Sequence, residues 1–130
     1  MTAMFILMNH KLEETQKEDA LITLKIDKFI FPPKNLQNLW EQIPPDKESI
    51  IEIIEPILNW LANHSNQGDY ILVHGDFGAT FIIVSWALQL KRIPVYSTTH
   101  RKYENKTNEN GEVVNVHTFK HVMFRRYRML

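Results

Sequence analysis

Short, mostly apolar runs alternate with stretches of helical spacing, and this alternation constrains the fold of the chain more than any other feature. The apolar runs have the length of strands and lie at residues 3–8, 28–31, 70–73 and 93–96. Apolar residues at helical spacing fill the intervals, at residues 11–24, 35–42, 46–64 and 80–90. Such alternation is typical of a doubly wound parallel sheet with right-handed crossovers.

The C-terminal part, residues 101–127, is predicted to form a long β-hairpin. Its tip is expected at Asn108-Glu109-Asn110-Gly111, because Asn-Gly strongly favours a tight turn. Phe119, Val122 and Phe124 are expected to join its return strand to the body. With strands numbered in chain order, the sequence predicts a single α/β domain over residues 1–130. This domain is a Rossmann-like, mostly parallel sheet of order 2-1-3-4 with the C-terminal β-hairpin at its edge.

Two residues are expected to shape the helical stretch at residues 46–64. Asp46 follows two prolines and is a candidate N-cap. Pro56 lies inside the stretch and is expected to kink the helix or to mark a second start. In the first helix, the inner face is predicted to carry Leu12, Ala20, Leu21 and Leu24.

The charges of the chain are unevenly distributed, although its net charge is zero. Residues 1–90 hold 6 Lys and Arg against 12 Asp and Glu, whereas residues 91–130 hold 9 against 3. Two interpretations stay open: an anionic partner near the C-terminal segment, or a basic edge that discourages aggregation.

The chain has no cysteine, which excludes a disulfide scaffold, a thiolate metal site and a cysteine nucleophile. No signal peptide or apolar stretch of membrane-helix length is apparent, so a cytoplasmic protein is predicted.

Polar clusters follow three of the predicted strands: Asn9-His10-Lys11, residues 74–80 and residues 97–101. In a parallel sheet, ligands bind beyond the carboxyl ends of the strands where the strand order reverses, here between the first and third strands. The clusters are therefore expected to form one phosphate-binding crevice. The candidate ligand-binding residues are Asn9, Lys11, Gly75, Phe77, Gly78, Ala79, Thr80, Ser97, Thr98, Thr99, Lys120 and His121.

Four residues are candidates for catalysis: His10, His74, Asp76 and Arg101. Imidazole titrates near neutral pH, so either histidine can serve as general base or acid. Arg101 suits bidentate contact with phosphate. Asp76 repels anions, and its alternatives are to cap the following helix, to orient a histidine or a ribose, or to hold a metal ion. Neither a zinc-ligand spacing nor a GxSxG motif occurs.

Four segments carry a resemblance to a known family: Met8-Asn9-His10-Lys11-Leu12, residues 68–80, residues 93–101 and residues 119–125. The pairing of Gly-Asp-Phe-Gly-Ala-Thr at 75–80 with Tyr-Ser-Thr-Thr at 96–99 is its most specific part. These segments resemble small accessory proteins of the Csx group from type III CRISPR antiviral systems, which are similar to CRISPR-associated Rossmann-fold domains. The resemblance implies a homodimeric ring nuclease that binds and linearises cyclic oligoadenylate messengers, cyclic tetra-adenylate above all.

The expected mechanism is attack by the ligand's own 2′-hydroxyl on the adjacent phosphate. Arg101, Lys11 and the amides of Gly78, Ala79 and Thr80 would stabilise the charge that develops on phosphorus. The scheme requires no cofactor or metal ion and involves neither membrane nor DNA. Two alternatives stay open: a non-catalytic sponge or sensor for the messenger, and an accessory protein whose basic hairpin binds RNA or a CRISPR effector.

Overall fold

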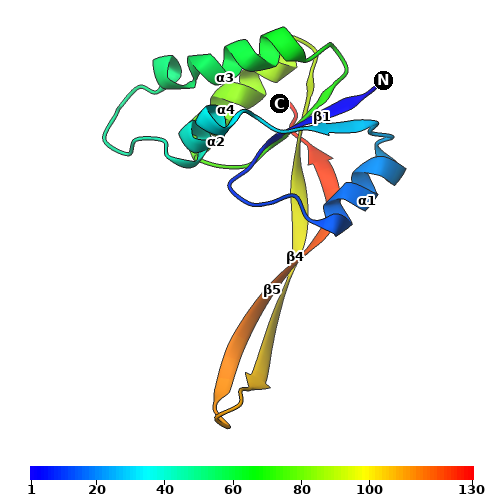
Figure 1. Ribbon diagram of the computed structural model, residues 1–130, viewed down its shortest axis with the longest axis vertical. Helices are drawn as coiled ribbons and strands as arrows, with labels where there is room; N and C mark the ends of the chain where they lie inside the picture. The colour runs from blue at the N-terminus through cyan, green and yellow to red at the C-terminus, as the bar shows by residue number, and fades with distance from the viewer.

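A five-stranded sheet forms the centre of the molecule in the computed structural model, which describes residues 1–130 (Figure 1). The strands are β1 (Ala3–Leu7), β2 (Lys28–Ile30), β3 (Tyr70–Val73), β4 (Ile93–Thr107) and β5 (Val113–Arg126). Their order is β2-β1-β3-β4-β5, so the predicted order of the first four strands is confirmed. Those four are parallel, whereas β5 runs antiparallel to β4. The fold is therefore mixed α/β and Rossmann-like only in part.

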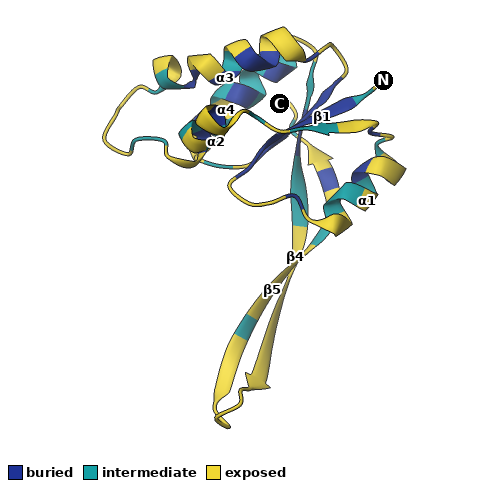
Figure 2. Cartoon of the chain, in the orientation of Figure 1, coloured by how far each residue is buried: buried dark blue, intermediate teal, exposed yellow.

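Helices cover both faces of the sheet, which explains why β1 and β3 are apolar throughout. Side chains alternate between the faces along a strand. Phe5, Leu7, Ile71 and Val73 pack against the helices α2 (Lys34–Glu41), α3 (Ile51–His64) and α4 (Phe77–Gln89). On the other face, Met4, Ile6 and Leu72 pack with Ala20 of α1 (Glu14–Thr23) and with Phe124 of β5. Figure 2 shows this buried centre in dark blue. None of the helices has the length and apolar character needed to cross a membrane.

Two expectations about the helices are wrong, and one of two alternatives for Pro56 is excluded. α3 begins at Ile51, so Asp46 is not its N-cap, and the first bond of the helix joins the Ile54 amide to the Ile50 carbonyl. Pro56 lies inside a single helix and does not start a second one. The carbonyl that Pro56 leaves without a partner belongs to Glu52, which is exposed and open to water. Leu21 is exposed on α1, whereas Leu12 and Ala20 are buried as expected.

The C-terminal hairpin differs most from expectation, because β4 does not end at Tyr96 but continues to Thr107. Residues 97–101 are thus part of a strand and do not follow one; β5 supplies hydrogen-bonding partners along this whole length. The tip is confirmed: the Asn108 side chain accepts from the amides of Asn110 and Glu112, and Gly111 has φ +78°. Figure 1 shows the far half of the hairpin projecting away from the body.

Of the three residues expected to join the hairpin to the body, only Phe124 is buried. Phe119 lies on the part of β5 that has left the core and is exposed. Val122 is exposed because it is the extra residue of a bulge: Thr98 pairs with Met123, whereas Thr99 pairs with His121.

Candidate active site

A cavity of about 470 Å³ opens where β1 and β3 end and extends along the near half of the hairpin. We call it the crevice. Its lining consists of Met8, His10, Lys11, Glu13, Gln16, His74, Ser97, Thr99, Arg101, Phe119 and His121. The predicted meeting of residues from the ends of the first and third strands is therefore found. Residues 97–101 reach the same place from within β4, where alternate side chains point into the crevice.

His10 and His74 lie opposite each other in the crevice, with ring centroids 6.3 Å apart and ring planes inclined at 46°. The backbone of His74 is held on both sides. Its amide donates to the Leu7 carbonyl at 2.9 Å, and its carbonyl accepts from the Trp40 indole at 3.1 Å. Before His10, the Met8 carbonyl accepts from the Gln37 side chain at 2.8 Å. α2 therefore fixes the backbone beside both histidines.

Gly75 is required because the buried Trp40 ring lies against it. A β-carbon at Gly75 would lie 2.8 Å from Trp40 Cε2 and Nε1, closer than packed atoms approach. Trp40 is 1% exposed and cannot move without disturbing the core. At Gly78, by contrast, a β-carbon would make only ordinary contacts of 3.5 Å with Asp76 and Ile50.

We expect Gly75→Ala to destabilise the protein by about 1–3 kcal/mol, the usual result of forcing an extra carbon into a packed interior. Urea unfolding followed by tryptophan fluorescence measures this difference. Gly78→Ala is the matched control and is expected to be neutral or slightly stabilising, because Gly78 is helical and alanine favours helices. Equal stability of Gly75→Ala and the wild type would contradict this explanation of the glycine.

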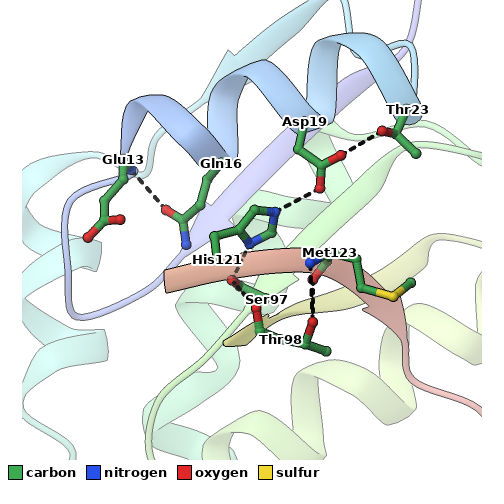
Figure 3. Close-up of polar contacts among 8 residues, drawn as sticks. All are labelled: Glu13, Gln16, Asp19, Thr23, Ser97, Thr98, His121 and Met123. Carbon is green, nitrogen blue, oxygen red and sulfur yellow. Dashed lines mark hydrogen bonds and ion pairs between the residues drawn. The ribbon is translucent and has the colours of Figure 1, made fainter. Parts of the chain in front are cut away.

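A hydrogen-bonded relay connects α1, β5 and β4 at the wall of the crevice (Figure 3). The His121 side chain is 3% exposed, and both of its ring nitrogens have partners. Nε2 contacts Asp19 Oδ2 at 2.7 Å, and Nδ1 contacts Ser97 Oγ at 2.5 Å. The Thr23 hydroxyl donates to the other oxygen of Asp19 at 2.5 Å. Through His121, the relay connects the Asp19 carboxylate to the hydroxyl of Ser97, which lines the crevice.

The pKa of Asp19 reflects competing influences. Burial raises it, but hydrogen bonds from Thr23 and His121, with the attraction of a charged His121 ring, outweigh burial and hold the pKa below the ordinary value of 3.8. A lowered carboxyl pKa in the folded state contributes stability above the pKa of the unfolded chain. That contribution is lost as the pH falls through the folded pKa.

The stability difference between wild type and Asp19→Asn is therefore expected to be largest near neutral pH and to shrink as the pH falls below about 4. Urea unfolding of both proteins at a series of pH values measures it. Glu14→Gln is a suitable control, because Glu14 is an exposed carboxylate of the same helix whose ion pair with Lys17 is on the surface. A difference that grew in acid would contradict the relay.

Cationic and aromatic side chains form the outer part of the crevice. Arg101 and Phe119 are direct partners across the hairpin, and the guanidinium lies 5.4 Å from the ring centroid. Lys11 lies on the loop after β1. Phe119 was not predicted as a site residue, because its pairing with Arg101 depends on the exact register of the hairpin. Nothing in the sequence points to Asp19, which lies 102 residues from His121.

Several predicted site residues lie outside the crevice. Asp76 caps α4 by accepting from the Ala79 amide at 3.0 Å, and its carbonyl accepts from the Thr80 amide at 2.8 Å. The amides of Ala79 and Thr80 are thus already used, and the Thr80 hydroxyl is buried without a partner. The remaining residues outside the crevice lining are Asn9, Gly75, Phe77, Gly78, Thr98 and Lys120.

Local structure explains why some of these residues lie outside the crevice. Thr98 and Lys120 point away from the crevice because neighbours in a strand alternate; the Thr98 hydroxyl donates to the Met123 carbonyl at 3.1 Å. Asn9 lines an adjoining hollow of about 500 Å³, which shares Met8, His10 and Lys11 with the crevice. Nowhere in the structure do three or more His, Cys, Asp or Glu side chains converge in a way that can hold a metal ion.

Comparison with known proteins gives one family. A family model described as "Uncharacterized protein MJ1673 family" matches residues 2–125. The chain is 43% identical over 127 residues to "Uncharacterized protein MJ1673" of Methanocaldococcus jannaschii, an alignment that covers 98% of each chain. No solved structure matches the chain.

Proposed function

The chain belongs to the Uncharacterized protein MJ1673 family, and from this starting point we propose that it is a ring nuclease that opens cyclic oligoadenylates, with cyclic tetra-adenylate as substrate. The observation that carries the proposal is the pair of imidazoles, His10 and His74, with centroids 6.3 Å apart in a crevice that Lys11 and Arg101 also line. Two imidazoles near cations suit cleavage of a phosphodiester, in which the attacking hydroxyl loses a proton and the leaving oxygen gains one. The cyclic substrate comes from the resemblance to the Csx group and to its Rossmann-like relatives.

In the proposed step, the 2′-hydroxyl oxygen of one nucleotide attacks the adjacent phosphorus. The bond from this oxygen to phosphorus forms, and the bond from phosphorus to the 5′-oxygen breaks. One histidine takes the proton of the 2′-hydroxyl, while the other donates a proton to the departing 5′-oxygen. The products are a 2′,3′-cyclic phosphate and a free 5′-hydroxyl. Arg101 and Lys11 stabilise the charge on the phosphorane oxygens.

Ser97 has a positioning role in this scheme. Ser97 Oγ contacts His121 Nδ1, and His121 Nε2 contacts Asp19, so these contacts fix the Ser97 hydroxyl at the wall of the crevice. The hydroxyl donates only a long hydrogen bond of 3.5 Å to the Thr98 carbonyl, and in the proposed step it donates to a phosphate oxygen in the crevice instead. Thr99, two residues along β4, offers a second hydroxyl on the same face.

We also propose that the protein acts as a homodimer, since a fourfold ring is best enclosed by two copies of one crevice. Phe77 and Phe81 lie four residues apart on α4 and are 95% and 72% exposed. Large apolar side chains exposed together are typical of contact surfaces. They are the surface that we propose for this contact.

The activity is tested by incubating the protein with labelled cyclic tri-, tetra- and hexa-adenylate, with and without EDTA, and resolving the products. The proposal expects multiple turnovers of the tetra-adenylate ring in both conditions. An intact ring in every lane would overturn it. Protection of one equivalent of ring without cleavage would instead favour the sponge or sensor, and strongly salt-dependent binding of linear RNA without preference for rings would favour the accessory protein.

A further inference from the structure

One face of the projecting hairpin continues the lining of the crevice. Directly paired residues share a face, and faces alternate along each strand. The face that carries Arg101 and Phe119 therefore continues through three further pairs: Tyr103 with His117, Asn105 with Asn115, and Thr107 with Val113. We call these eight residues the ladder face.

The ladder face has no carboxylate, whereas Glu104 lies on the opposite face, paired with Val116. The one full charge on the ladder face is the Arg101 cation. The opposite face carries Lys102, Lys106 and Lys120 against Glu104, so both faces of this ribbon are net positive and suit a polyanion. The aromatic rings distinguish the ladder face from the opposite face.

Aromatic rings on the ladder face are exposed to solvent. Tyr103 and Phe119 are 66% and 57% exposed. The Tyr103 ring packs against the edge of His117 at 4.6 Å between centroids, and Arg101 lies over Phe119. These contacts hold the rings in place on a two-stranded ribbon that no helix covers (Figure 2). Such a ribbon is only marginally stable by itself in water, so a bound partner would stabilise it.

From these observations we propose that the ladder face binds single-stranded oligoadenylate by stacking unpaired bases on Phe119 and Tyr103. Base–aromatic stacking is the usual way in which proteins hold unpaired nucleotides. Arg101 and Lys11 hold phosphates at the mouth of the crevice, and the amides of Asn105 and Asn115 reach base edges. The inference rests on the proposed function for the identity of the base, but binding by this face does not depend on cleavage.

The test is a fluorescence anisotropy titration with two labelled probes, linear hexa-adenylate RNA and cyclic tetra-adenylate. Comparing the two affinities shows whether the ladder face prefers a linear or a cyclic ligand. Tyr103→Ala and Phe119→Ala are each expected to weaken binding of at least one probe about 5- to 100-fold. Tyr103→Phe is expected to retain affinity, because the ring is kept. Val114→Ala is the matched control, since Val114 is an exposed residue of the opposite face.

The outcomes separate the inference from the proposed activity. Loss of binding in the alanine variants without cleavage by the wild type would support the inference and overturn the ring nuclease. Normal cleavage and unchanged affinity for both probes in both alanine variants would overturn the inference alone. If Tyr103→Ala instead turned a dimer into a monomer without changing either affinity, the ladder face would be a contact between copies and the inference would be wrong. Circular dichroism verifies that each variant is folded.

Discussion

Replacing His74 with alanine is expected to lower the rate of opening of cyclic tetra-adenylate by about 100- to 10,000-fold, the usual contribution of a positioned general acid or base. His10→Ala is expected to have an effect of similar size, because the two rings serve one proton transfer each. Affinity for the ring is expected to change little, since Arg101 and Lys11 remain. Single-turnover rates with excess enzyme measure the chemical step.

The pH profile adds a second readout for the histidines. The wild type is expected to show a bell-shaped rate profile, and each single variant is expected to lose one limb of it. His100→Asn is the matched control: His100 is an exposed histidine of β4 whose side chain alternates away from the crevice. Rates in His74→Ala and His10→Ala within a few fold of the wild type would contradict the two-histidine mechanism.

Arg101→Ala is expected to weaken binding of cyclic tetra-adenylate about 10- to 100-fold, because a hydrogen bond to a charged group contributes about 1.5–3 kcal/mol. Two effects combine here: the loss of a phosphate contact and the loss of the guanidinium that packs on Phe119. Arg101→Lys is expected to recover only part of the affinity, since an ammonium group cannot make a bidentate contact. Isothermal titration calorimetry measures the affinities.

Salt dependence distinguishes a phosphate contact from general weakening. The slope of log affinity against log salt is expected to fall by about one for Arg101→Ala. Lys102→Ala is the control, because Lys102 is the next residue of β4 and points to the opposite face. An equal loss of affinity in both variants would contradict a specific role for Arg101, since it would reflect only the overall charge of the hairpin.

The body of the fold was predictable because its signals are local. The runs that form β1 and β3 are too short and too apolar for anything but buried strands, and the order of the parallel strands follows from their connections. The rule that ligands gather at strand ends predicted that His10 and His74 lie near each other, and both line the same cavity. His74 directly follows an apolar run and His10 follows one after Asn9, and these positions are visible in the sequence.

Two of the errors concern contacts between residues far apart in the chain. Where β4 ends depends on pairing with β5, so residues 97–101 appear to be a loop until that pairing is known. Asp19 enters the site only because α1 packs on β5. Asp76 is different: its candidate roles were to cap the helix, to orient a histidine or a ribose, or to hold a metal ion. Its hydrogen bond from the Ala79 amide, a local contact, makes it the cap.

The crevice of His10, His74, Lys11 and Arg101 is proposed to cleave RNA-type phosphodiesters by means of the ligand's own 2′-hydroxyl. The most direct test compares cyclic tetra-adenylate with its all-2′-deoxy counterpart and identifies the product ends by mass spectrometry. The account predicts that the ribose ring is opened to a 2′,3′-cyclic phosphate and a 5′-hydroxyl, whereas the deoxy ring binds and stays intact. An intact ribose ring, or equal cleavage of both rings, would contradict it.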